Sequence, residues 1–227
     1  MHFLNAAPKS DVQKRRIKIE ANRMSKCITM AVFCFLFIFA PGGVVGDEPR
    51  IIRVEEDWQL EVTTPDPLQY SPQFSTWMSP SDSLDDEHFC ANFNHAQKSG
   101  YPGGGFQINA FQGTALMDES LHRSGVTLSS NGESVRWTQV MAIVNDELVF
   151  AIKNGTSQSW GDFGGPETLV RFSSSLNNLN RYHPSRSVEW SGVGFAANRV
   201  AFLKLAKVRL FTDQGLVLET SVNLVVQ

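Results

Sequence analysis

Cysteine is scarce in this chain of 227 residues: it has three, and only Cys90 lies beyond the first 34 positions. A single cysteine cannot form an intramolecular disulfide, so stability must come from a core, for which 42% hydrophobic residues are sufficient. Two motifs are also missing. The chain has no G-x-S-x-G nucleophile elbow and no glycine loop ending in G-K-[ST], which argues against an elbow-type serine hydrolase and a phosphate-binding loop.

Basic charge is scarce after the N-terminal segment. Seven of the 20 Lys and Arg residues, but only two of the 23 Asp and Glu residues, precede residue 47, which leaves a net charge of −8 over 47–227. A nucleic-acid partner requires a basic face for its phosphates, and docking on anionic lipid requires the same. The charge therefore predicts no nucleic-acid partner and no membrane surface as partner.

The N-terminal segment, residues 1–46, has the parts of a secretory signal. A basic stretch is followed by thirteen residues, 28–40, that are almost wholly apolar. A membrane-spanning helix needs about 20 apolar residues, so this length favours a cleaved signal peptide over the alternative of an uncleaved membrane anchor. Cleavage after Gly46 predicts an exported protein (periplasmic, cell-surface or extracellular), whether translation starts at Met1 or at Met24.

Residues 47–227 carry no helical stripe of useful length. Short runs of β-branched and aromatic residues are instead interrupted by Gly, Asn, Pro and Ser about every ten residues, which is typical of an all-β domain. Ten strands in about 175 residues favour a single two-layer antiparallel β-sandwich, of the jelly-roll or concanavalin-like kind, over a small barrel. The predicted strands are 53–64, 73–79, 87–95, 105–113, 133–144, 147–154, 167–175, 188–196, 201–213 and 215–226.

Two local features are predicted in more detail. Asn145-Asp146 separates two strand patterns, and both residue types tolerate positive φ, so a two-residue hairpin loop is expected. Its register places Ile143 opposite Leu148. In the strand 201–213 the apolar positions change from odd to even numbers, and a bulge near Ala206-Lys207 would restore one inward-facing set.

Carboxylates provide the first candidates for catalysis. Glu55, Asp57 and Glu61 share one face of the first predicted strand. Glu55 and Asp57 lie about 7 Å apart along the backbone, a spacing that the acid pair of a glycoside hydrolase can have. Trp58 points to the other face, so the flat aromatic that a sugar subsite generally needs is missing. A secreted glycan-active enzyme using Glu55 and Asp57, or Glu189, is therefore an alternative hypothesis.

Thiol and metal chemistry have little support. Cys90 lies in the middle of a predicted strand, where cysteines are usually inert. His88, Cys90 and His95 cannot converge on Zn²⁺ within one strand, because position 95 faces away from the other two. No catalytic residue, metal or cofactor is therefore predicted. One acidic turn contains Asp82, Asp85 and Asp86, whose oxygens could bind Ca²⁺. The turn lacks the residue spacing of a helical calcium loop, so it is interpreted as a solvated turn.

One connection between strands is unusually rich in aromatic residues. The stretch "NGTSQSWGDFGG", residues 154–165, places a Trp and a Phe among small polar residues and glycines. In a ligand site, Trp160 and Phe163 would stack on a sugar face while Asn154 and Asp162 bind its hydroxyls. In a structural segment, the two rings would fold back over an end of the sandwich, which is favoured because large aromatic surfaces are costly to leave in water.

Three stretches carry a resemblance to a known family: "VEEDWQLEVTTPDP" (54–67), "SWGDFGGPETLVRF" (159–172) and 175–219, which includes "SGVGFAANRV" and "VRLFTDQG". They resemble a family of exported proteins of unknown function from planctomycete-type bacteria, over about Val54 to Glu219. The resemblance implies a two-sheet sandwich of the concanavalin-like or jelly-roll kind. It implies no activity and no catalytic residue.

The sequence thus predicts an exported, non-catalytic β-sandwich module that binds glycan or another protein in the cell envelope. Two alternatives stay open. One is the secreted glycan-active enzyme, and the other is a purely structural component of an envelope assembly. The oligomeric state is not predicted.

Overall fold

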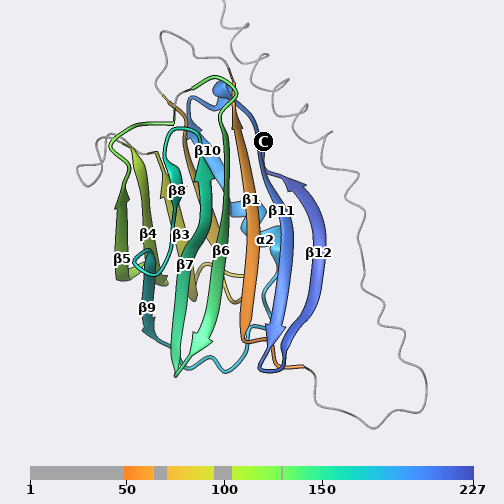
Figure 1. The fold of residues 1–227 in the computed structure, drawn as a ribbon. Helices are drawn as coiled ribbons and strands as arrows, with labels where there is room; N and C mark the ends of the chain where they lie inside the picture. Colours follow the sequence, from red (N-terminus) through yellow and green to blue (C-terminus); the bar gives the residue numbers. More distant parts are fainter. Residues whose placement is uncertain (1–48, 64–70, 95–103, 129) are drawn as a thin grey trace, which may run out of the picture. The chain divides into compact units, whose positions relative to one another are not determined.

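The structure is a computed structural model that describes residues 49–63, 71–94, 104–128 and 130–227 (Figure 1). From residue 49 on, these residues form one compact unit. Its elements, in chain order, are β1 (Arg53–Val62), β2 (Gln73–Met78), β3 (Glu87–Phe93), β4 (Gly105–Gln112), β5 (Ala115–Arg123), β6 (Ser134–Val144), β7 (Glu147–Ser157), β8 (Gly161–Phe163), β9 (Leu169–Ser173), α2 (Pro184–Trp190), β10 (Gly192–Phe195), the 3₁₀ helix η1 (Ala197–Arg199), β11 (Val200–Thr212) and β12 (Gly215–Val225).

The strands form two antiparallel sheets that pack face to face. Sheet A has the order β12-β11-β1-β6-β7-β8, with β9 also pairing with β7, and sheet B has the order β10-β2-β3-β4-β5. In Figure 1 the strands of sheet A run side by side from β12 to β7, and α2 lies close to β11. The predicted all-β, two-layer antiparallel β-sandwich is confirmed.

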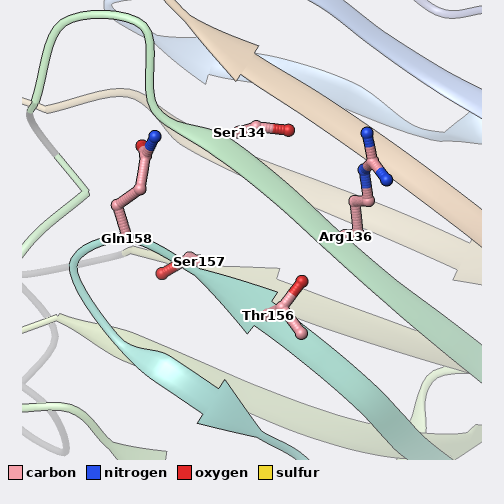
Figure 2. Close-up of a pocket in the computed structure, with 5 residues that line it drawn as sticks. All are labelled: Ser134, Arg136, Thr156, Ser157 and Gln158. Atoms are coloured by element: carbon pink, nitrogen blue, oxygen red, sulfur yellow. The ribbon is translucent and has the colours of Figure 1, made fainter.

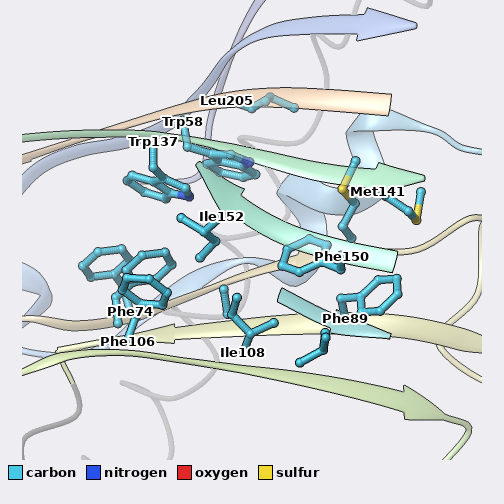
Figure 3. Close-up of a cluster of buried hydrophobic side chains, with 14 of the residues drawn as sticks. Trp58, Phe74, Phe89, Phe106, Ile108, Trp137, Met141, Phe150, Ile152 and Leu205 are labelled. Carbon is cyan, nitrogen blue, oxygen red and sulfur yellow. The ribbon is translucent and has the colours of Figure 1, made fainter. Parts of the chain in front are cut away.

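The core between the sheets combines aliphatic side chains with stacked aromatic rings (Figure 3). Trp58 and Trp137 stack within sheet A, with 6.3 Å between ring centroids, and Phe74 of sheet B packs against Trp137 at 5.8 Å. Phe89 of sheet B stacks on Phe150 of sheet A at 4.9 Å. Each fully buried aromatic side chain contributes about 2–3 kcal/mol relative to exposure, so these contacts between the sheets account for much of the stability.

Both local predictions are confirmed. Asn145 and Asp146 have φ values of 51° and 63°, and Ile143 lies opposite Leu148, as the two-residue hairpin requires. Between β1 and β11, Asp57 pairs with Lys207 and Trp58 pairs with Leu205, so Ala206 is the extra residue of a bulge. The bulge restores the inward direction of the apolar side chains on β11.

The predicted strand over 188–196 is wrong in its first half. Pro184–Trp190 form helix α2, and only Gly192–Phe195 form a strand, β10. Proline at the first helical position favours this start, because its φ is already helical and its missing N–H would have no partner there. The sequence patterns also fail to predict β5 and β8, each of which lies at the edge of a sheet.

The predicted leader, residues 1–46, lies outside the described residues, as do both alternative starts and His95. Among the residues that the structure describes, no helix is long and apolar enough to cross a membrane.

Candidate functional site

Strand β1 lies between β11 and β6 and carries polar side chains on both faces of sheet A. Val54, Trp58 and Leu60 point into the core and are fully buried. Glu55 and Asp57 point to the outer face, which is the face turned away from sheet B. Glu56 also points inward, with 0% of its surface exposed. Two separate polar clusters therefore lie on the two sides of β1.

The outer cluster is a charge ladder formed by Glu55, Asp57, Lys153 and Arg209. Glu55 accepts a hydrogen bond from Lys153 Nζ at 2.6 Å and another from Arg209 Nε at 3.0 Å. Arg209 donates two further bonds to the Asp57 oxygens, at 2.6 and 2.7 Å. Partial burial raises the pKa of Glu55, but the hydrogen bonds and charges of Lys153 and Arg209 outweigh it and hold that pKa below its ordinary value.

The charge ladder does not suit the predicted catalytic pair. A glycoside hydrolase needs one carboxyl that still holds its proton near neutral pH. The pKa of Glu55 moves in the opposite direction, and Asp57 is bound in bidentate fashion by a guanidinium. Glu189, the other candidate acid, pairs with Arg186 on α2 at 2.6 Å. This geometry gives no support to catalysis by these carboxylates.

A shallow depression lies on the same outer face, beyond the charge ladder along β6 and β7 (Figure 2). It has a volume of about 320 Å³ and is called the β6–β7 depression below. Two of its side chains project from β6, two come from the end of β7 and one follows that strand. The five residues that line it are Ser134, Arg136, Thr156, Ser157 and Gln158.

A bulge in β7 shapes the β6–β7 depression. Arg136 pairs with Thr156 and Thr138 pairs with Lys153, so Asn154 and Gly155 together oppose the single residue between them on β6. Asn154 accommodates the bulge with a φ of 53°. A Cβ atom at Gly155 would overlap with the ring of Phe163, so the position requires glycine. The bulge brings Thr156 back to the outer face, beside Arg136.

Arg136 is the only charged residue in the lining, and its side chain is exposed. Among the described residues, no carboxylate lies within ion-pair distance of its guanidinium. Hydroxyl groups and an amide surround it instead. A planar group with several N–H donors is thus presented next to side chains that both donate and accept hydrogen bonds.

One of the two rings in the aromatic segment that was predicted as a candidate ligand site, Phe163, lies in the core. Phe163 is 4% exposed and packs on Phe106 at 5.6 Å and on Trp160 at 5.4 Å. The prediction that its ring stacks on a ligand is corrected, because Phe106, Trp160 and Gly155 cover it. Trp160 is half-buried, and its Nε1 donates to the Val126 carbonyl at 2.9 Å.

The two polar members of the predicted ligand site, Asn154 and Asp162, are both exposed. Asn154 provides the backbone geometry of the bulge, and Asp162 pairs across β7 and β8 with Thr156. A ligand-binding role for Asn154, Trp160 and Asp162 stays a prediction. Of the four, only the half-buried Trp160 ring and the two polar side chains are accessible to a ligand.

A buried glutamate, which the sequence reasoning missed, anchors the aromatic segment. Glu133 is fully buried and accepts hydrogen bonds from the backbone N–H of Ser159 at 2.8 Å and from its hydroxyl at 2.7 Å. The bonds hold the middle of the segment, directly before Trp160, close to the start of strand β6, which follows Glu133. The sequence gives little indication of this contact, because a glutamate directly before a strand is usually part of a solvated turn.

The inner cluster on β1 is centred on Glu56, which was also missed. Its carboxylate accepts hydrogen bonds from Tyr182 Oη at 2.7 Å and from Trp58 Nε1 at 2.8 Å, and Ser187 of α2 bonds to it as well. Burial raises the pKa of Glu56 to about 7, although these three donors partly oppose the shift. The one charged residue at an inward position of β1 is the signal that could have revealed it.

The cysteine and the acidic turn are occupied by other contacts. Cys90 is 3% exposed, with its Sγ 3.6 Å from Asn92 Oδ1. Asp82 pairs with Arg181 at 2.9 Å, and Asp85 accepts a hydrogen bond from Ser83. In the described ranges, no group of three His, Cys, Asp or Glu residues is placed to hold a metal ion.

Neither a scan against protein-family models nor a search of the curated proteins finds a match for this chain. The resemblance to exported planctomycete proteins therefore stays a prediction.

Proposed function

We propose that the protein is an exported, non-catalytic β-sandwich module that binds glycan in the cell envelope, with the β6–β7 depression as its ligand site. Export is proposed from the predicted signal segment, residues 1–46. The observation that carries the binding proposal is the combination in one depression of three hydroxyl side chains, one amide and the exposed guanidinium of Arg136.

The chemistry of this lining supports a hydroxylated ligand. Ser, Thr and Gln side chains can each donate and accept hydrogen bonds, which matches the mixed donors and acceptors of sugar hydroxyls. The volume of about 320 Å³ lies at the lower end of the range of small-ligand sites, roughly 300–1,000 Å³. An open depression on a sheet face also accepts part of a long chain without enclosing its ends.

A protein partner is less well supported at this position. The centre of a protein interface generally contains large apolar or aromatic anchors. The lining of the β6–β7 depression contains none. The neighbouring charge ladder favours a non-catalytic role, since its carboxylates are already bound to cations.

A glycan array followed by calorimetric titration tests the proposal on the protein purified after expression of the full chain. We expect binding to at least one polysaccharide class, and a loss of that binding in Arg136→Met and Thr156→Val. Arg181→Met is the matched control, because this exposed arginine lies outside the depression. An array without response, or binding that survives both substitutions, would reject the site.

A second candidate function, a structural component that assembles with copies of itself, is favoured by the edge strand β12. It ends sheet A and is eleven residues long. A long, apolar edge strand is a template for a strand of another chain, and antiparallel pairing with the β12 of a second copy would continue the sheet. Four large apolar side chains on it are 39–60% exposed: Leu216, Val217, Leu218 and Val225.

Sedimentation velocity over a wide concentration range tests this candidate. We expect a concentration-dependent dimer that Val217→Lys converts to a monomer, because a charge at an edge strand opposes pairing. A wild-type protein that stays monomeric at high concentration would reject it. The result does not bear on glycan binding, since β12 contributes no residue to the β6–β7 depression.

A further inference from the structure

Charges on the outer face of sheet A are paired in one half and unpaired in the other. In the paired half, three acids have a cation within about 3 Å: Glu55 with Lys153 and Arg209, Asp57 with Arg209, and Glu219 with Lys207. Arg136 and Lys204 belong to the other half. Across the described part of the chain, neither has a carboxylate within ion-pair distance.

The two unpaired cations lie in one row across the strands. Gln59 on β1 pairs with Arg136 on one side and with Lys204 of β11 on the other. Adjacent strands are about 4.8 Å apart, so the two backbones are separated by about 10 Å. Lys204 Nζ lies 4.9 Å from the ring centroid of Phe202, a contact that orients the ammonium without neutralising its charge.

The two cations without an ion pair belong to a part of the chain, residues 47–227, whose net charge is −8. Two acids are close in register: Glu61 lies in the next row, opposite Ser134 and Phe202, and Asp162 lies in the same row as Arg136, opposite Thr156. Neither acid forms an ion pair with Arg136 or Lys204 at 4.0 Å or less. Two cations held apart from the available carboxylates can accept an anion from outside the chain.

The groups around the two cations favour a carboxylate on a sugar. Guanidinium binds a carboxylate through two parallel N–H···O bonds. The hydroxyls of Ser134 and Thr156 flank Arg136 and can bind the neighbouring sugar hydroxyls. A polymer with repeated carboxylates can place one on Arg136 and a later one on Lys204.

We propose that the β6–β7 depression binds a carboxylate-bearing glycan, whose acid group pairs with Arg136 while Lys204 holds a second acid group. The inference rests on the proposed function, because it names the ligand class of the same site. Arg136 is the main determinant, since it alone of the two lines the depression.

The test is a calorimetric titration of the full-chain protein with five polymers. These are polygalacturonate, its methyl ester, a neutral galactan, dextran sulfate and polyglutamate. We expect polygalacturonate to bind, with an affinity that falls as salt is raised because the contact is ionic. The methyl ester, which keeps the sugar and loses the charge, is expected to bind about tenfold or more weakly.

Variants separate the contributions of the two cations. Arg136→Met is expected to weaken polygalacturonate binding by about ten- to a hundredfold, as the loss of a charge-assisted hydrogen bond does. Arg136→Lys should recover part of it, because the charge returns without the planar fork. Lys204→Met is expected to cost about threefold. Lys207→Met, a cation of the same face that is paired with Glu219, is the matched control and should change nothing.

Failure of this inference is distinguishable from failure of the proposed function. If the neutral galactan or the methyl ester binds as tightly as polygalacturonate and Arg136→Met weakens both, the glycan module stands and the carboxylate inference is overturned. The carboxylate inference is also overturned if dextran sulfate or polyglutamate binds as tightly as polygalacturonate, because the site would then recognise negative charge alone. If polygalacturonate, its methyl ester and the neutral galactan all fail to bind, and the glycan array gives no response, both proposals fail.

Discussion

Glu55 and Glu56 follow one another on β1 but lie on opposite sides of sheet A, and the pKa values of their carboxyls move in opposite directions. On the outer side, Lys153 and Arg209 lower the pKa of Glu55. On the inner side, burial raises the pKa of Glu56 to about 7, because its partners there are neutral donors. The comparison shows that the direction of the shift depends on two things: Glu56 is the more deeply buried carboxyl, and only Glu55 has cations beside it.

The two sides also differ in how much stability their polar groups carry. In the outer pairs of Glu55 the carboxylate is largely covered, but the side chains of Lys153 and Arg209 still contact water, so each pair is worth about 1 kcal/mol or less. Around Glu56, water is excluded, and each donor that loses its acceptor costs about 1–3 kcal/mol. The inner cluster also ties Tyr182 and α2 to β1, so its loss loosens the segment that covers that end of the core.

The largest expected effect is that of Glu56→Ala. The substitution removes the acceptor of Tyr182 Oη and Trp58 Nε1, and we expect the free energy of unfolding to fall by about 3 kcal/mol at pH 6. Urea denaturation measures it. Glu55→Ala is the matched control on the other side of the strand, with an expected loss of about 1 kcal/mol or less. Equal losses for the two variants would contradict the difference between the sides.

The second prediction concerns pH. The folded pKa of Glu56, about 7, exceeds its ordinary value of 4.5. Its contribution to stability is therefore complete below pH 4.5 and is lost as pH rises through about 7. The lowered pKa of Glu55 acts in the opposite sense, since its contribution is present above 4.5 and is lost as pH falls through the folded pKa.

Urea denaturation of the wild type and of Glu56→Gln between about pH 5 and pH 8 measures this effect. We expect the wild type to lose on the order of 2–3 kcal/mol relative to the variant over that range. Comparing the two proteins removes the contributions of His88 and His122, whose pKa values are lowered by burial in both. A constant difference between wild type and variant across the range would show that Glu56 does not titrate there.

Much of the fold follows from local sequence patterns. The hairpin at Asn145-Asp146 and the bulge near Ala206 were predictable because turn residues and period-two alternation act over a few positions. The edge strand β5 was not, since its sequence "ALMDESLHR" alternates too weakly. In α2, Val188 and Trp190 resemble strand residues, and only Pro184 indicates a helix.

The site was harder to predict than the fold. Arg136 and Thr156 are twenty positions apart, and only the register of β6 and β7, shifted by the bulge, places them together. Asn154-Gly155 reads as a turn in the sequence, although it is the bulge itself. The argument that large aromatics avoid water agrees with the burial of Phe163, but its partner Phe106 lies too far along the chain for local patterns to identify.

The third prediction applies the same contrast at the bulge, where Gly155 faces the core and Asn154 faces water. A Cβ atom at residue 155 would overlap with the Phe163 ring, so we expect Gly155→Ala to lower the free energy of unfolding by about 1–3 kcal/mol. Combining it with Phe163→Leu should cost less than the two single substitutions together, because the smaller side chain makes room. Strict additivity in this double-mutant cycle would mean that the two residues do not interact.

The smallest expected effect on stability comes from the charge ladder. Arg209 is 18% exposed at its side chain, and we expect Arg209→Met to lower the free energy of unfolding by about 1 kcal/mol at low salt and by less at about 1 M salt. The same measurement on Arg136→Met should show no change, because its guanidinium has no ion pair within the described residues.

Arg209 and Arg136 should show the opposite order of effects when glycan binding is measured instead of stability. Arg209→Met is expected to leave polygalacturonate binding within about twofold of the wild type, because Arg209 lies outside the β6–β7 depression and is already occupied by Glu55 and Asp57. Arg136→Met is expected to lose it. If both substitutions weaken binding equally, the outer face acts through its total charge, and the division between a paired and an unpaired half has no functional meaning.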